Sequence, residues 1–472
     1  MILRNQCCVT WGCVFREHAK ILRLPLGGVS NLNAGWLLFQ IAVGLGILTL
    51  LFLSQRFWHR AIWRFASHLR SAWMRVALRL VWLGVLALMV AAFVDAARMR
   101  QSHDFHFRGP ILLAAGLWFS SALFAYLAVK AIHGVERLWR WIHWSALKLA
   151  PAGKPPHPAA PEIVKDPSRR YFFRTATFLA GTAPFLTAVY GFAAERLRYR
   201  TLRVEVPVPK LPPALDGLRI AQLSDIHLSG FMTREDLRRA VDMANELGAD
   251  LAVVTGDFIT GAADPLADCI EELRGLRAPL GIWGCNGNHE IYARAEDAAQ
   301  GLFAQAGMKL LRQENVQLAF RGAPFNLIGV DYQRERGPNG RRLKMLSHVE
   351  PLVRRDMPNI LLSHNPNSFT RAAELGIELT LAGHTHGGQV QVEILDHSFS
   401  PARFITDYIA GLFQRPLFAP AVNTLGGPQL LLANAATSGL ASLYVNRGLG
   451  TVGAPVRLGV PPEITLLVLR RA

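Results

Sequence analysis

The sequence predicts an N-terminal α-helical membrane region followed by a C-terminal α/β domain. Long uncharged apolar runs are confined to residues 1–200, whereas residues 201–472 alternate short apolar runs with amphipathic segments. The charge divides at the same place. Of the formal net charge of +17, residues 1–200 carry +18 and residues 201–472 carry −1. The positive excess therefore accompanies the apolar runs, and we expect no nucleic-acid partner despite the pI near 10.3.

Four membrane spans are expected in the first part of the chain. Residues 36–54, 110–129 and 175–194 are free of charge and long enough to cross a hydrocarbon core of about 30 Å as helices. Residues 76–94 form a weaker span, because Arg79 lies within it and must reach the interface. The alternative is a set of buried helices in a soluble protein, which is difficult to reconcile with several such runs. The first three spans form an N-terminal membrane region, residues 1–150.

Basic residues in the loops predict the orientation of these spans. The loops between spans one and two and between spans three and four hold 14 Lys and Arg, against 7 on the other side. Such loops are cytoplasmic in most membrane proteins, so the C-terminal domain is expected on the extracytoplasmic side. The expected location is a bacterial inner (plasma) membrane, crossed several times.

A proline-rich linker, residues 151–174, precedes the fourth span. Its last part, Ser168–Arg174, resembles a twin-arginine export signal, although two ordinary cytoplasmic arginines would explain it equally well. His103 and His106 are more typical of a loop than of a metal site. Cys269 and Cys285 are expected to be buried thiols rather than a disulfide, and no zinc-binding cysteine pattern is present.

Residues 201–472 contain strand-like runs separated by helical segments. Strands are expected at residues 201–208, 218–224, 251–255, 281–285, 360–363 and 379–382, where apolar and β-branched residues concentrate. A helix is expected to begin after Thr233, with Asp236 three residues later completing a capping box, and to end at Gly248.

Five of these strands are followed by side chains that bind metals. Ligands bind beyond the carboxyl ends of strands in open α/β sheets, so these side chains are expected to converge. The donor types suit Mn, Fe or Zn. Seven donors exceed the needs of one ion and suit two divalent ions that share a carboxylate. The candidates are Asp225, His227, Asp257, Asn288, His364, His384 and His386.

Each short pattern alone has a simpler explanation, since a lone aspartate often caps a turn and a lone histidine often lies in a core. His384 and His386 are more specific: on a strand their imidazoles would share one face, and the flanking glycines permit close backbone approach. The ordered series of five strand ends is what favours a metal centre.

The series resembles the signature of the calcineurin-like metallophosphoesterases. The matching segments are Asp225–His227, Gly256–Asp257, Gly287–Glu290, Ser363–His364 and Gly383–His386. Within that family, the chain is similar to the membrane-anchored YkuE and YaeI type, also described as transmembrane proteins with a metallophosphoesterase domain. Gly387–Gln389, Tyr444–Gly448 and Pro461–Ile464 extend this similarity. It covers residues 201–472.

The resemblance implies two facing mixed β-sheets flanked by helices and a two-metal hydrolysis of phosphate esters. It implies one ion on Asp225, His227 and His386, and a second ion on Asn288, His364 and His384. Asp257 would bridge the two ions, and His289 would assist the transition state or protonate the leaving oxygen. Cys285 and Asn286 depart from the apolar residues usual before Gly287, but they replace no ligand.

The expected function is therefore a membrane-anchored phosphoesterase acting on phospholipid, glycolipid or cell-envelope substrates. Its partners would be the lipid bilayer and a phosphate ester, either free or lipid-linked. Two alternatives remain open: a catalytically silent sensor or scaffold, and a cytoplasm-facing hydrolase of a nucleotide-linked lipid precursor. The latter conflicts with the predicted orientation. A transport function finds little support, because Arg79 is the only charge inside a predicted span.

Overall fold

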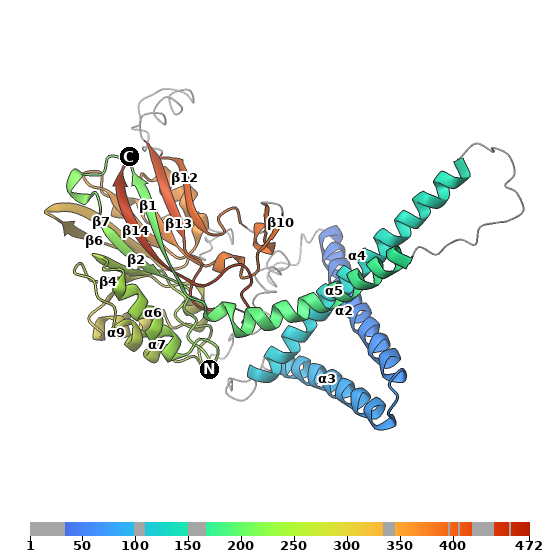
Figure 1. The fold of residues 1–472 in the computed structure, drawn as a ribbon. Coiled ribbons are helices and arrows are strands. Elements are labelled where there is room, and N and C mark those ends of the chain that lie inside the picture. Colours follow the sequence, from blue (N-terminus) through green and yellow to red (C-terminus); the bar gives the residue numbers. More distant parts are fainter. Residues whose placement is uncertain are drawn as a thin grey trace, which may run out of the picture. The chain divides into compact units, whose positions relative to one another are not determined.

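The computed structural model describes residues 34–98, 109–149, 167–333, 345–394, 397–404, 406–417, 439–452 and 455–472. The chain divides into two compact units, Met1–Tyr190 and Gly191–Ala472. The first is helical, and the second contains both sheets (Figure 1). Each unit is described separately below.

The helical unit contains α2 (Ala34–Ser67), α3 (Ala72–Arg98), α4 (Gly109–Leu149) and most of α5 (Pro167–Ala193). Three segments of the described residues are long and apolar enough to cross a membrane: Ala72–Ala91, Ala114–Ile142 and Arg170–Leu197. They overlap the predicted spans 76–94, 110–129 and 175–194. The predicted span 36–54 lies within α2, where many side chains fall outside the described set.

Polar contacts hold the long helices against one another. The indole of Trp58 on α2 donates to the Ala122 carbonyl oxygen on α4 over 2.8 Å. Trp118 on α4 donates in turn to Gln55 Oε1 on α2 over 3.2 Å. The apolar residues that remain exposed on these helices include Phe52, Leu80 and many others, as expected for surfaces that face lipid rather than water.

Several sequence features fall outside the described residues: Cys7, Cys8, Cys13, His103, His106 and most of the proline-rich linker. The arginine-rich Ser168–Arg174 segment forms the first turns of α5. Cys269 and Cys285 are both buried free thiols, in agreement with the expectation from the sequence.

The second unit is built on two mixed sheets that face each other, as the resemblance implied. In the described residues each sheet has six strands, in the orders β1-β14-β2-β3-β4-β5 and β12-β13-β9-β8-β7-β6, and a hairpin, β10-β11, lies apart. The strands are β1 (Arg200–Val208), β2 (Arg219–Leu223), β3 (Leu251–Val254), β4 (Ile282–Gly284), β5 (Lys309–Leu310), β6 (Glu314–Phe320), β7 (Ala323–Val330), β8 (Asn359–Ser363), β9 (Leu379–Ala382), β10 (Val392–Ile394), β11 (His397–Phe399), β12 (Gly411–Pro416), β13 (Leu440–Val445) and β14 (Glu463–Arg471).

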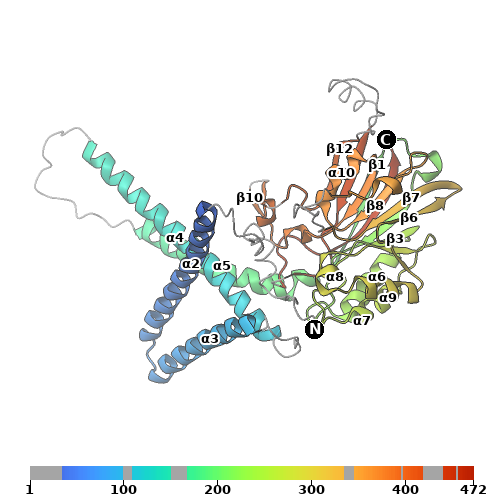
Figure 2. The ribbon, with the colours of Figure 1, turned by 180° about the vertical axis from the view of Figure 1, so that it is seen from behind.

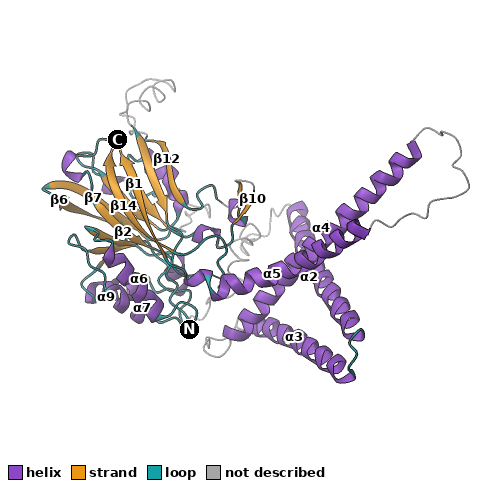
Figure 3. Ribbon diagram, in the orientation of Figure 1, coloured by secondary structure: helices purple, strands orange, loops and turns teal. Residues whose placement is uncertain are grey.

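A core of apolar side chains fills the space between the two sheets. Val206 and Val253 from the first sheet pack there with Phe325, Leu362 and Leu381 from the second. The alternation of strand side chains sends their neighbours outward, so Val254 packs in a second core beneath helices. The result is the layered arrangement of helices and sheets visible in Figure 3.

Helices cover the outer face of each sheet. The described helices of this unit are α6 (Arg234–Glu246), α7 (Leu266–Leu273), α8 (Asn288–Ala293), α9 (Glu296–Gln305) and α10 (Phe369–Glu374). Those near β2–β5 appear below the sheet in Figure 1, and the view from behind adds α8 and α10 (Figure 2). The Thr233 side chain accepts from the Asp236 backbone, and the reciprocal bond completes the predicted capping box.

The predicted strands are confirmed, and their parallel pairing positions the candidate ligands. β2, β3 and β4 are mutually parallel in the first sheet, and β7, β8 and β9 are mutually parallel in the second. Their carboxyl ends therefore lie at a common edge of each sheet. The loops that leave these ends carry the candidate metal ligands.

Candidate metal centre

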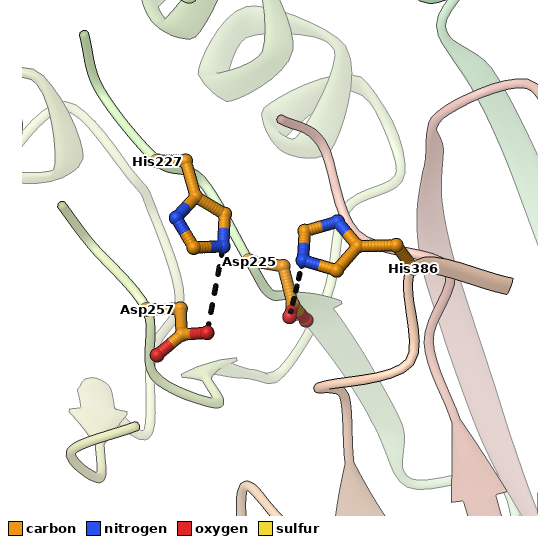
Figure 4. A group of neighbouring side chains, drawn as sticks. All are labelled: Asp225, His227, Asp257 and His386. Atoms are coloured by element: carbon orange, nitrogen blue, oxygen red, sulfur yellow. Dashed lines mark ion pairs between the residues drawn. The ribbon is translucent and has the colours of Figure 1, made fainter. Parts of the chain in front are cut away.

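Four of the predicted ligands form one buried cluster, shown in Figure 4. Asp225, His227, Asp257 and His386 each offer one ligand atom, and these atoms all lie within 4.8 Å of one another. His227 Nε2 is 3.4 Å from Asp257 Oδ2, and His386 Nε2 is 3.3 Å from Asp225 Oδ1. The group spans both sheets, because His386 follows β9 whereas the other three follow β2 and β3.

A second cluster shares Asp257 with the first. Its members are Asp257, His364 and His384, again with ligand atoms within 4.8 Å. His364 Nε2 lies 3.1 Å from Asp257 Oδ2 and 3.2 Å from Asn288 Oδ1. One carboxylate oxygen thus stands within 3.4 Å of an imidazole nitrogen from each cluster. All seven predicted residues are therefore brought together, with Asp257 between the two groups.

The aspartates are oriented by backbone donors. The His289 amide donates to Asp257 Oδ1 over 2.9 Å, which leaves Oδ2 toward the two imidazoles. The His384 amide donates to both oxygens of Asp225, over 2.9 and 3.0 Å. Charge-assisted bonds of this kind hold a carboxylate in a single orientation before any ligand arrives.

Several candidate ligands have left-handed backbone conformations. The φ angles are +49° at Asp225, +50° at His227, +57° at Asp257, +76° at His384 and +51° at His386. Non-glycine residues rarely adopt this region, and such strain concentrates at functional sites where the surrounding structure enforces it.

The expectation that His384 and His386 share a strand face is wrong. β9 ends at Ala382, and the two histidines lie in the following loop, where His386 begins a short 3-10 turn. Because each has a positive φ, their side chains diverge, and each joins a different cluster. The expected close approach is confirmed at Gly383, where any β-carbon would collide with Ser224 Oγ and Asp225 Oδ2.

Hydrogen bonds select the ring nitrogen that each histidine presents to the cluster. His364 Nδ1 is 2.6 Å from the Thr255 carbonyl oxygen, which can only accept, so this nitrogen carries the proton and Nε2 holds a lone pair when the ring is neutral. His227 Nδ1 is 3.2 Å from Thr260 Oγ1, and its buried Nε2 has no hydrogen-bond partner among the described residues. These are the arrangements typical of metal-binding histidines.

Burial and charge shift the pKa values in the cluster in opposite directions. Burial lowers the pKa of His227 and holds that of His386 well below its ordinary value. Burial opposes ionisation of Asp257, but His364 and His289 outweigh it and keep the pKa of this carboxyl well below its ordinary value. Burial also opposes protonation of His364, yet Asp257 and Asp225 raise its pKa to about 10. The buried carboxylates thus attract positive charge to this position, which a divalent cation would satisfy.

His289 lies at the side of the first cluster. Its ring centroid is 4.7 Å from that of His227, and its Nδ1 is 2.7 Å from the Thr260 carbonyl oxygen. Nδ1 therefore donates to the carbonyl, and Nε2 is the atom left to gain or lose a proton.

Glu290 supports the centre in a way that the sequence did not reveal. Its Oε1 accepts from the amides of Phe258 (2.8 Å) and Ile259 (3.3 Å). Its Oε2 accepts from the amides of Asp257 (2.9 Å) and Gly287 (2.8 Å). The side chain is completely buried, and it joins the loop after β3 to the start of α8. Its place in the Gly287–Glu290 motif was the only sequence signal.

The sequence also gave no sign of the aromatic rings beside the two clusters. The ring of Tyr332 lies 5.5 Å from that of His384 and 6.2 Å from that of His364, and Tyr292 lies 5.9 Å from His289. Asn286, which departs from the usual motif, donates to Asp331 Oδ1 over 2.8 Å. It therefore has a structural partner and leaves the ligands undisturbed.

Comparison with known proteins gives the family. The family model for calcineurin-like phosphoesterases matches residues 218–388, which include every member of both clusters. The chain is 30% identical over 321 residues to the uncharacterized metallophosphoesterase YkuE of Bacillus subtilis (strain 168), covering 65% of this chain and 99% of that protein. The chain belongs to the calcineurin-like phosphoesterase family.

Two further relatives of this phosphoesterase differ in what their names say. The transmembrane protein with metallophosphoesterase domain of Danio rerio is 30% identical over 309 residues, or 63% of this chain. The match spans 63% of that relative's own length, which is less than two thirds. The UDP-2,3-diacylglucosamine pyrophosphatase LpxG of Chlamydia trachomatis serovar D is 26% identical over 332 residues, which cover 60% of this phosphoesterase and 93% of LpxG.

Proposed function

We propose that this protein is a membrane-anchored phosphoesterase that hydrolyses phosphate esters with two divalent metal ions. The observation that carries the proposal is the position of Asp257 Oδ2, within 3.4 Å of His227 Nε2 and 3.1 Å of His364 Nε2. One oxygen shared between two buried donor groups is the arrangement that a bridged pair of cations requires.

The donors divide into two sets around this bridge. Asp225, His227 and His386 would hold one ion, and Asn288, His364 and His384 the other. Oxygen and imidazole donors suit Mn, Fe or Zn. When bound, such ions stabilise the negative charge of a phosphoryl group and lower the pKa of water.

We propose that His289 donates a proton to the leaving oxygen. Its Nδ1 is engaged by the Thr260 carbonyl, so Nε2 is the atom that would deliver a proton to an alkoxide as the ester bond breaks. The same bond holds the ring in place, because a rotated imidazole would leave a carbonyl without its donor.

A phosphate ester carried by a membrane is the proposed substrate class, namely a phospholipid, a glycolipid or a cell-envelope carrier. Only Ala194–Tyr199 separate α5 from β1. Each residue spans at most about 3.6 Å, so these residues form only a short tether between α5 and the second unit. A short tether raises the effective concentration of substrates in the same bilayer.

The site is proposed to face the extracytoplasmic side of a bacterial inner membrane, on the charge bias of the loops. A second candidate places it in the cytoplasm, acting on a nucleotide-linked lipid precursor. The similarity to a UDP-2,3-diacylglucosamine pyrophosphatase favours this candidate. A catalytically silent sensor is disfavoured, because loss of activity is expected to remove ligands and all seven are present.

The proposal is tested with the full chain in detergent and its Asp257→Asn variant. We expect about two Mn²⁺ per wild-type chain and hydrolysis of p-nitrophenyl phosphate or bis(p-nitrophenyl) phosphate. The amide lacks the charge that a bridge requires, so Asp257→Asn should lose metal and turnover together. A variant with full turnover, or a wild-type protein that binds no metal, would refute the two-metal assignment.

Orientation requires a separate experiment. An alkaline phosphatase fused after Ala194 should be active in bacterial cells, since that enzyme folds only outside the cytoplasm. A cytoplasmic reporter fused at the same residue serves as the matched control. Activity of the cytoplasmic reporter alone would select the nucleotide-linked precursor as the substrate class.

A further inference from the structure

Arg457 is a completely buried arginine close to the proposed metal centre, and it is the largest fully buried side chain among the described residues. Its Nη2 donates to the carbonyl oxygens of Arg447 (2.9 Å), Gly448 (3.0 Å) and Gly450 (2.5 Å). Its Nη1 donates to the carbonyl oxygen of Val460 over 3.2 Å. A single guanidinium therefore donates hydrogen bonds to four backbone carbonyl oxygens.

The positive charge of Arg457 is stabilised by carbonyl oxygens rather than by an acidic side chain. Among the described residues, no carboxylate lies within ion-pair distance of Arg457, and its Nε has no hydrogen-bond partner. Buried charges are costly and normally paired, so a buried arginine bound only by carbonyl oxygens requires an explanation. Burial lowers its pKa to about 10, against the opposing charges of Asp225 and Glu463, so the side chain stays charged at neutral pH.

Residues 447–450, whose carbonyl oxygens accept from Arg457, lie directly against the metal ligand Asp225. The Leu449 amide donates to the Ser224 carbonyl oxygen over 3.0 Å, and the Gly450 amide donates to the Asp225 carbonyl oxygen over 2.7 Å. Gly448, at φ +72°, packs so closely that an added β-carbon would be 2.5 Å from the Asp225 β-carbon. Residues 447–450 therefore pack directly behind Asp225.

Residues 447–450 also lie beside two candidate ligands whose backbone is in the left-handed region. Asp225 and His227 have φ angles of +49° and +50°, which other contacts must enforce. Gly450 lies beside both, since a β-carbon there would be 3.0 Å from that of His227. Without Arg457, the carbonyls of residues 447–450 would lose their shared donor, and the loop would be free to move away from Asp225.

We propose that Arg457 is a positioning residue that fixes the metal ligand Asp225 through the backbone of residues 447–450. The inference rests on the proposed metal centre and goes beyond it. Among the described residues, the hydrogen bonds of the Arg457 side chain go to backbone carbonyl oxygens and to none of the candidate ligands. Arg457 acts on the ion held by Asp225, His227 and His386, and not on the ion held by Asn288, His364 and His384.

A general structural role would have a different signature. Loss of a buried side chain that only stabilises the fold lowers the thermal midpoint and affects both ions equally. A positioning role weakens one ion selectively, as loss of the groups that orient metal ligands typically costs about 10- to 100-fold in metal affinity. The two roles are therefore separable by the stoichiometry of metal binding.

The experiment compares Arg457→Met and Arg457→Lys with the wild-type full chain in detergent. Free Mn²⁺ is measured by electron paramagnetic resonance during titration, and thermal unfolding is followed in parallel. We expect two Mn²⁺ sites in the wild type, and one of them weakened about 10- to 100-fold in Arg457→Met. Arg457→Lys retains the charge and some donors, so it should restore part of that affinity.

Arg219→Met provides the matched control. Arg219 begins β2, the strand that ends before Asp225, and it pairs with Asp250 far from the ligand loops. This variant should keep both Mn²⁺ affinities. If Arg457→Met does not fold, hydrogen exchange of the Leu449 and Gly450 amides in Arg457→Lys replaces it, and faster exchange than in the wild type is expected.

The outcomes separate this inference from the proposed function. Unchanged Mn²⁺ affinities in both Arg457 variants, unchanged amide exchange in Arg457→Lys, or equal weakening of both sites would overturn the positioning role alone. A wild-type chain that binds no Mn²⁺ would overturn the metal centre and, with it, the inference.

Discussion

His289 has one ring nitrogen committed to structure and one available for chemistry. The bond between Nδ1 and the Thr260 carbonyl oxygen is 2.7 Å long, and the ring packs edge-on against His227. The residue follows the proposed ligand Asn288 but belongs to neither cluster. These contacts separate a proton-transfer role from a metal-binding role, which makes the two roles testable independently.

Replacing His289 should therefore impair turnover and spare the metal. We expect His289→Ala to retain about two Mn²⁺ per chain and to lose roughly 10²-fold or more in kcat, the scale typical of a positioned acid. Steady-state hydrolysis and metal analysis on the same sample provide the measurement. The control is Asp257→Asn, which should lose both. Wild-type turnover in His289→Ala would remove this residue from the mechanism.

Glu290 is the residue whose importance is most easily underestimated from the sequence. Each oxygen of its carboxylate accepts hydrogen bonds from two backbone amides, so neither oxygen can be replaced by a hydrogen-bond donor. Glutamine has nearly the same shape, but its amide nitrogen would face two backbone donors. Each unsatisfied buried donor costs about 1–3 kcal/mol.

Glu290→Gln should accordingly lower both the thermal midpoint and the Mn²⁺ affinity, because the loop that carries Asp257 loses its anchor. Glu272→Gln is the matched control. Glu272 is also largely buried, but it pairs with the partly exposed Arg234 and Arg238. It should change Mn²⁺ affinity little. Equal behaviour of the two variants in thermal unfolding and metal titration would contradict the anchoring role.

At the scale of elements, the centre depends on how closely neighbouring strand ends approach. β2 and β9 belong to different sheets, yet the loops beyond them meet at Ser224, Asp225 and Gly383. No side chain larger than hydrogen fits at Gly383. The glycine is therefore required by packing between two elements, and its φ is not in the left-handed region.

Gly383→Ala should displace Asp225 and weaken the ion that it holds, because the new methyl group overlaps both Ser224 Oγ and Asp225 Oδ2. Mn²⁺ titration should show one weakened site. Gly301→Ala is the control, since Gly301 lies within α9 with open space around it. That change should be neutral or stabilise the helix by about 0.5–1 kcal/mol. Two intact sites in Gly383→Ala would show that the loops adjust freely.

At the scale of the whole molecule, the second unit begins before its first strand. Tyr199 is buried in the core beneath the helices, and its hydroxyl lies 3.2 Å from Met232 Sδ. Arg196 donates to the Phe192 and Phe231 carbonyl oxygens, each over 2.6 Å. The residues that leave α5 are thus part of the unit Gly191–Ala472.

A chain that begins at Thr201 should be less stable than one that begins at Gly191. Loss of the buried Tyr199 is expected to cost about 3–5 kcal/mol, the usual range for a large aromatic side chain. The thermal midpoint should then fall by roughly 10 °C. Differential scanning calorimetry of the two chains measures the difference. Equal midpoints would place residues 191–200 outside the cooperative unit.

Much of the second unit follows from local sequence. The apolar runs at 218–224, 251–255 and 379–382 have the length of strands, and each became one, because such segments bury both faces in a parallel sheet. The helix after Thr233 was likewise predicted from its own capping residues. Strand pairs such as β6–β7 and β12–β13 were not predicted, since β6 and β12 contain no buried residue and their segments lack the continuous apolar run of the predicted strands.

The sequence by itself determined the donor set: the order of Asp, His and Asn at strand ends is enough to name all seven candidate ligands. The resemblance to the metallophosphoesterases implied how they divide into two groups, and tertiary structure alone decided the backbone geometry that brings each group together. Positive φ angles sent His384 and His386 apart, although their spacing suggested one face. It also decided the supports, because Glu290 accepts from the distant Phe258 amide and the loop bound by Arg457 meets Asp225, which lies far earlier in the chain. The type of each side chain can be read from the sequence. The backbone conformation at the ligands and the long-range hydrogen bonds form only when the sheets pack together.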